Sequence, residues 1–165
     1  MKIAVKDANI LIDLANGGLV EAVLRLPYDF VTTDAVLLQL ENETQWEQVR
    51  PYVEQGVIQT MHLSGEEMQK VADDPLRDRL GIADLEVLTL AAREKGILLT
   101  GDLDLRKEAK TRQVTVHGLI WLLDRLLEKE LLERAEAAKK LRLMMALGAR
   151  LPADEVARRL RDWAK

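Results

Sequence analysis

Acidic side chains at the ends of apolar segments are the groups in this sequence most suited to chemistry. Asp7 follows the first apolar segment, and Asp102 and Asp104 follow a later one. Asp84 and Glu86 open the helix that leads into that later segment. Carboxylates that crowd together repel one another, and oxygen ligation of Mg²⁺ or Mn²⁺ relieves the repulsion. Such a cation also activates water for attack on a phosphodiester, so the pattern points to metal-dependent hydrolysis.

The strands and helices that would position these acids can be predicted from alternating apolar and helical segments. Short segments rich in Val and Ile alternate with segments of helical periodicity over the first 117 residues. The expected strands are 3–5, 29–32, 57–60, 97–100 and 114–116, and the expected helices include 10–14, 19–26, 34–40, 84–95 and 153–164. This alternation predicts a three-layer α/β fold with a mainly parallel central sheet. The carboxyl ends of the strands, and with them the acids, are expected to meet at one edge, where such sheets bind ligands.

Each acid also has a plain structural interpretation. Asp84 could cap a helix, and Asp102 and Asp104 could form turns. Asp7 is harder to explain in this way because it follows a strand of the buried type. The joint arrangement, rather than any single residue, therefore carries the interpretation.

Composition narrows the classes of function. The sequence has no cysteine, which excludes disulfides and thiolate sites and fits a reducing cytosol. Its two histidines, His62 and His117, are far apart, which disfavours a His-rich metal site. No apolar run approaches the roughly 18 residues of a membrane helix, and the N-terminus lacks a secretory signal pattern. A cytoplasmic protein with no membrane association is therefore expected.

Charge is unevenly distributed along the chain. Residues 1–128 hold 14 Lys and Arg against 22 Asp and Glu, and residues 129–165 hold 10 against 6. We interpret residues 1–128 as a catalytic domain and residues 129–165 as a C-terminal helical extension, packed on the domain or at an interface. The split can mark a nucleic-acid partner, but a pI near 5.3 argues against binding by bulk charge. A solvated helix surface explains the tail equally well.

In order and spacing, these motifs resemble those of the PIN-domain nucleases. Segment 5–14 is similar to the family's opening motif, in which Asp7 ends the first strand and Asn9 follows. The further similar segments are 81–91, 98–105 and 114–118. The ordered set covers roughly residues 3–128, and the remaining helices resemble those of a stand-alone prokaryotic subgroup.

The resemblance implies cleavage of single-stranded or structured RNA with Mg²⁺ or Mn²⁺ as cofactor. By position, the catalytic metal ligands would be Asp7, Asp84 and Asp102, with Asp104 as an alternate ligand. Asn9 and Thr100 would orient the carboxylates.

Other residues near these motifs are ambiguous. Glu86 is two residues from Asp84, so the two cannot share one helical face unless Asp84 precedes the helix. Arg106 and Lys107 would contact RNA phosphates, although a solvated helix face explains them too.

One departure from the family's pattern concerns the helix after the second strand. The family places a glutamate there, and the alignment puts Gln39 at that position. An amide can hydrogen-bond a metal-bound water but brings no charge, so weaker metal affinity is expected. Glu43 lies one helical turn further and could reach the site, although a solvated surface acid is the simpler interpretation.

Small prokaryotic members of the family are often VapC-type toxins, so the resemblance also implies an antitoxin protein partner and a homodimer. The rival interpretation is a catalytically weakened PIN-like module that binds RNA or protein, because of Gln39. A third class, the phospho-acceptor receiver-like domain, also has acids at strand ends. It is disfavoured because no lysine accompanies the acids at the strand end where such a domain needs one.

Overall fold

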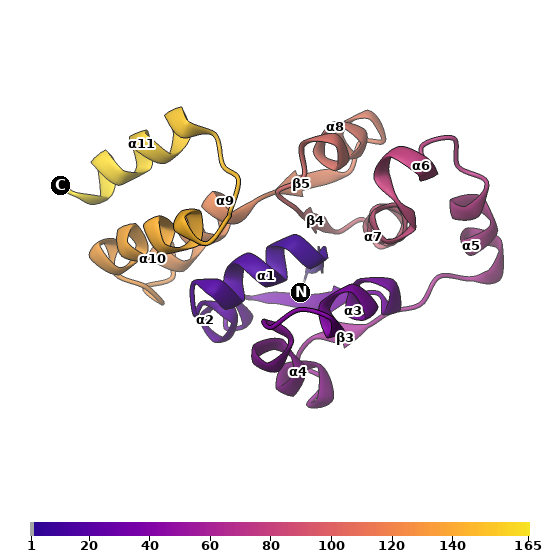
Figure 1. Ribbon diagram of the computed structural model, residues 1–165, viewed down its shortest axis with the longest axis horizontal. Coiled ribbons are helices and arrows are strands. Elements are labelled where there is room, and N and C mark those ends of the chain that lie inside the picture. Colours follow the sequence, from indigo (N-terminus) through magenta and orange to yellow (C-terminus); the bar gives the residue numbers. More distant parts are fainter. Residues whose placement is uncertain (1) are drawn as a thin grey trace.

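The computed structural model describes residues 2–165 and has a central sheet surrounded by helices (Figure 1). The strands are β1 (Lys2–Lys6), β2 (Tyr28–Thr32), β3 (Gln59–Thr60), β4 (Ile97–Leu99) and β5 (Thr115–His117). The helices are α1 (Ala8–Asn16), α2 (Val20–Leu24), α3 (Asp34–Glu41), α4 (Trp46–Glu54), α5 (Gly65–Ala72), α6 (Arg77–Leu80), α7 (Ile82–Arg93), α8 (Leu103–Thr111), α9 (Leu119–Glu128), α10 (Arg134–Ala146) and α11 (Ala153–Trp163). Neighbouring strands pair in parallel in the order β3-β2-β1-β4-β5. The predicted three-layer α/β fold with a mainly parallel sheet is confirmed.

The sheet brings the carboxyl ends of β1 and β4 side by side. Lys6 of β1 lies opposite Leu99 of β4 in the parallel register. The Asp7 N–H donates to the Leu99 carbonyl at 3.3 Å, which extends the strand pairing by one residue. Asp7 and Thr100 therefore leave neighbouring strands at the same level.

The close approach of β1 and β4 depends on a glycine. Gly96 precedes β4, and a Cβ at this position would lie 2.6 Å from the carbonyl oxygen of Ile3. Because that oxygen belongs to the backbone, a larger residue could fit only if the strands moved apart. The glycine that was expected to end a helix thus also allows the two central strands to pair.

The C-terminal helices share the hydrophobic core of the sheet. Leu141 and Met144 of α10 are fully buried in this core, and α10 packs on α1 and α9. An ion pair joins α11 to α9, in which Arg159 donates to the Asp124 carboxylate at 2.7 and 3.1 Å. In Figure 1, α10 and α11 lie at the opposite end of the molecule from α5 and α6.

Several helices differ from the sequence-based expectation, and α4 and α7 show why. The helix α4 was not predicted, because its sequence is largely polar and Pro51 lies inside it. Burial of Val49 and packing of α4 on α1 favour the helix in spite of the proline. The helix α7 begins at Ile82, two residues before the expected start, after Gly81 with a left-handed backbone at φ 90°.

None of the helices in the described part of the chain combines the length and apolar character needed to cross a membrane.

Candidate metal-binding active site

Helix capping fixes two of the candidate carboxylates at the carboxyl edge of the sheet. Asp7 is the N-cap of α1, and its Oδ1 accepts the Ile10 N–H at 2.8 Å. Asp102 is the N-cap of α8, and its Oδ1 accepts the Leu105 N–H at 2.8 Å. Aspartate is favoured at such positions because its side chain satisfies a backbone N–H that the helix leaves unpaired. Capping therefore orients each carboxylate but uses only one of its two oxygens.

The Thr100 side chain connects these two aspartates. Its hydroxyl donates to Asp7 Oδ2, and its Oγ1 accepts the Asp102 N–H at 3.0 Å. Thr100 is fully buried and Asp7 is 2% exposed, so this connection is shielded from solvent. One buried hydroxyl thus joins the end of β1 to the start of α8.

The third carboxylate comes from α7. Because Gly81 is the N-cap, Asp84 is the third residue of the helix and its side chain is not needed for capping. Asp84 and Asp102 both act electrostatically on Asp7, and Asp102 acts on Asp84. Three acids from three separate elements therefore lie close enough to influence one another's charge.

The pKa values of these carboxyl groups reflect burial and mutual repulsion. Burial raises the pKa of Asp7 to about 7, opposed by hydrogen bonds from Thr100 and Ile10 and reinforced by Asp84 and Asp102. Burial and the charge of Asp102 raise the pKa of Asp84 to about 6. Within the described residues, no ion pair with lysine or arginine offsets these charges. None of the described lysine and arginine side chains therefore compensates these acids.

The donor chemistry suits a hydrated divalent cation. In residues 2–165, no group of three or more His, Asp or Glu side chains is already arranged to hold a metal ion. Mg²⁺, however, keeps several waters and is usually bound through only one or two carboxylates. The uncompensated carboxylates fit an ion of this kind, and Mn²⁺ prefers the same oxygen ligands.

Other residues from the sequence analysis lie outside this contact network. Glu86 is 6% exposed and accepts a hydrogen bond from Thr33, the N-cap of α3, and burial raises the pKa of its carboxyl. It points toward α3 because it is two residues from Asp84 on the same helix. Asn9, Gln39 and Asp104 are exposed. Of the five acids expected to converge, Asp7, Asp84 and Asp102 influence one another's charge, whereas Glu86 accepts a hydrogen bond from Thr33 and Asp104 is exposed.

A basic side chain lies next to the Thr100 connection. Arg106 Nη1 donates to the Thr100 carbonyl at 3.2 Å, whereas Lys107 is exposed. The Arg106 guanidinium occupies the space beside Gly118, where a Cβ would lie 2.6 Å from Nη1. Sequence reasoning missed this contact, although Arg106 follows Asp102 by one helical turn and Gly118 directly follows the last strand.

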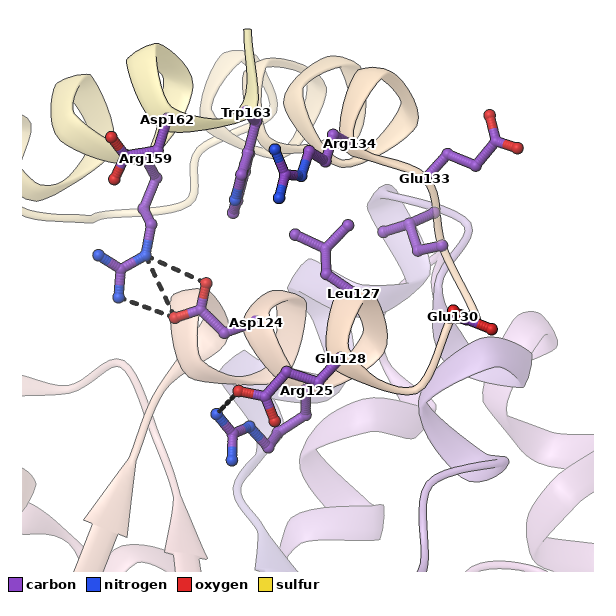
Figure 2. Close-up of a pocket in the computed structure, with 11 residues that line it drawn as sticks. Asp124, Arg125, Leu127, Glu128, Glu130, Glu133, Arg134, Arg159, Asp162 and Trp163 are labelled. Carbon is purple, nitrogen blue, oxygen red and sulfur yellow. Dashed lines mark hydrogen bonds and ion pairs between the residues drawn. The ribbon is translucent and has the colours of Figure 1, made fainter. Parts of the chain in front are cut away.

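A cavity of about 740 Å³ lies between α9, α10 and α11. In Figure 2, Trp163 and Leu127 point toward one another across this space, and the Asp124–Arg159 ion pair lies at its side. Asp7, Asp84 and Asp102 do not line it, so this cavity is separate from the candidate site.

The parallel α/β fold places Asp7 and Asp102 at the carboxyl edge of its sheet, with Asp84 close enough to influence their charge. A family model for PIN domains matches residues 3–165, and the chain belongs to the PIN-domain family. PIN domains are generally nucleases that use divalent metals and bind nucleic acid. The match extends through α10 and α11. None of the curated proteins compared with the chain matches it.

Replacing Asp7 should stabilise the metal-free protein at alkaline pH. The pKa of Asp7 rises from 3.8 to about 7 on folding, so between those pH values the native state keeps a proton that the unfolded state releases. Stability therefore falls as pH rises through this window. Asp7→Asn removes this loss, which is at most about 4 kcal/mol, and asparagine still caps the helix.

Thermal unfolding in EDTA at pH 4 and pH 8 measures this effect. The melting temperature of Asp7→Asn minus that of wild type should be higher at pH 8 than at pH 4. The difference should be roughly 2–4 °C for each kcal/mol of stability that wild type loses. Asp78→Asn, at an exposed acid, should show no such rise. A melting-temperature difference that is the same at both pH values would show that Asp7 ionises normally.

Proposed function

We propose that this protein is a Mg²⁺- or Mn²⁺-dependent endoribonuclease in which Asp7, Asp84 and Asp102 hold the cation. The supporting observation is that three acids from three elements influence one another's charge, and that none of the described lysine and arginine side chains is paired with them. Burial of unpaired charge is costly, so carboxylates with a purely structural role are normally paired. An uncompensated set at the carboxyl edge of the sheet is better explained by a cationic ligand.

Each carboxylate has its own part in this proposal. Hydrogen bonds from Thr100 and Ile10 orient Asp7, and such support of a metal ligand often matters as much as the ligand. Asp102 Oδ2 and the Asp84 carboxylate accept no hydrogen bond within the described chain, so their lone pairs are available. Mg²⁺ or Mn²⁺ bound here would supply an activated water and offset charge on the phosphodiester.

Residues around this pocket have supporting parts. Asp104, in the first turn of α8, is the proposed alternate ligand, and Asn9 is the proposed orienting residue on α1. Arg106 and Lys107 would contact phosphates of the RNA, and the bond from Arg106 to the Thr100 carbonyl places that guanidinium next to the pocket.

The biological setting is a further part of the proposal. We assign the chain to the VapC-toxin-like subgroup, with an antitoxin protein partner, a homodimeric state and a cytoplasmic site of action. A short antitoxin-like reading frame directly upstream of this one would support the toxin assignment.

Removal of one proposed ligand should abolish cleavage. Asp84→Asn keeps the size of the side chain but removes its charge, so it should lower Mn²⁺-dependent cleavage of a fluorogenic RNA by about 100-fold or more. EDTA should abolish wild-type cleavage, and Asp78→Asn should cleave like wild type. Wild-type activity in Asp84→Asn would overturn the assignment.

A catalytically weakened module that binds RNA or protein is the second candidate. It is favoured by Gln39, which is exposed on α3 and brings no charge to the position where the family places a glutamate.

Gln39→Glu separates the two candidates. If the protein is a working nuclease, wild type should bind Mn²⁺ in calorimetry and cleave RNA, and the variant should bind the ion more tightly. If wild type binds no Mn²⁺ and cleaves nothing while the variant does both, the weakened module is the correct function.

A further inference from the structure

A second cavity opens directly beside the acidic pocket. It measures about 260 Å³ and is bounded by the start of α8, the end of β5, the first turn of α9 and the loop between α10 and α11. Gly101 and Leu103, the residues on either side of Asp102, line it. The cavity therefore borders the segment that carries Asp102, one of the proposed metal ligands.

The lining of this cavity carries an excess of positive charge. Its arginines are Arg106, Arg150 and Arg159, of which Arg159 is paired with Asp124. Arg106 and Arg150 form no ion pair with any described residue. The remaining acid of the lining is Glu155, in a chain whose net charge is −4. The cavity is thus a local cationic site on an acidic protein.

Arg106 is held in place for an anionic ligand. One of its five N–H donors is used by the Thr100 carbonyl, and the others are available to a phosphate. Gly118 leaves room for the guanidinium, since a Cβ there would lie 2.6 Å from Nη1. The backbone of Gly118 has φ −127°, which alanine also adopts, so the glycine is needed for this space rather than for its conformation.

The other walls of the cavity are apolar and aromatic. Leu119, Ile120, Leu151 and Pro152 give an apolar surface. The rings of His117 and Trp121, which also line the cavity, stack at 4.2 Å with an interplanar angle of 3°. A planar base fits against apolar and aromatic walls, and phosphate fits against guanidinium groups.

The size of the cavity restricts the ligand. Its volume of about 260 Å³ is just below the roughly 300–1,000 Å³ of small-molecule sites. It therefore has room for about one nucleotide and none for a double helix.

The larger cavity between α9, α10 and α11 is a poorer candidate. Its acidic residues, Asp124, Glu128, Glu130, Glu133 and Asp162, outnumber its arginines, Arg125, Arg134 and Arg159 (Figure 2). A polyanion would be repelled from it.

We propose that the 260 Å³ cavity binds one unpaired nucleotide of the RNA next to the scissile phosphodiester. Its phosphate contacts Arg106 and Arg150, and its base lies against the apolar wall. This inference rests on the proposed nuclease function and adds the cavity and the two arginines that hold the RNA beside the scissile bond. It also gives the C-terminal helices a part in substrate selection, because Arg150 lies between them.

Binding without cleavage tests this inference. The full-length chain is titrated in EDTA against a short fluorescent single-stranded RNA, with anisotropy as the readout, over a series of salt concentrations. Arg150→Ala should weaken binding about tenfold, as loss of a charged hydrogen bond does. It should also reduce the salt dependence of log K by about 0.7, the value for one phosphate of a single strand. Gly118→Ala should weaken binding similarly, because its Cβ displaces the Arg106 guanidinium.

The matched control is Arg142→Ala, which removes an exposed arginine of α10 that does not line the cavity. It should bind like wild type, and wild type should bind the single strand more tightly than a duplex of the same sequence. Equal affinity of Arg150→Ala and Arg142→Ala, or equal losses with single strand and duplex, would overturn the inference.

The two proposals fail in different ways. If Arg150→Ala binds RNA like wild type and Mn²⁺-dependent cleavage is retained, only the nucleotide site is refuted. Absence of cleavage with the Arg150→Ala effect retained refutes only the nuclease.

Discussion

The buried hydroxyl of Thr100 is the contact on which the acidic pocket depends. It donates to Asp7 and accepts the Asp102 N–H, so it holds together the ends of two neighbouring strands and the helices that begin there. Burial of this contact raises the pKa of Asp7, so its carboxyl group stays partly protonated near neutral pH. A shifted pKa next to two further acids is typical of a functional site rather than of a stabilising one. The strands β1 and β4 and the helices α1 and α8 hold this arrangement in place.

Sequence reasoning placed Asp7 and Asp102 at one edge of the sheet because the carboxyl ends of parallel strands lie at the same edge. Asp7 and Asp102 each follow a central apolar strand, and such residues must lie at the same edge whatever the surrounding helices do. The reasoning overestimated the number of converging acids. Glu86 was grouped with Asp84 by proximity in sequence, but 200° of helical rotation between them turns Glu86 toward Thr33.

Features that depend on distant residues could not be predicted from sequence. The helix α4 contains a proline and few apolar residues, and it forms because Val49 finds a buried position against the rest of the fold. The neighbourhood of Arg106 is a similar case, since it depends on the missing Cβ of Gly118 twelve residues later. The place of Arg150 beside α8 and α9 follows from how α11 is joined to α9 by Arg159, which no local pattern reveals.

The central claim is that Asp7, Asp84 and Asp102 bind a divalent cation. The most direct test is to measure how many protons the protein releases when the cation binds. Mn²⁺ is titrated into the protein by calorimetry at pH 6 in two buffers of different ionisation enthalpy. Because the pKa of Asp7 is about 7 and that of Asp84 about 6, binding should release about one proton or more, and release should vanish at pH 9. Binding heat without proton release at pH 6, or no binding at all, would contradict the account.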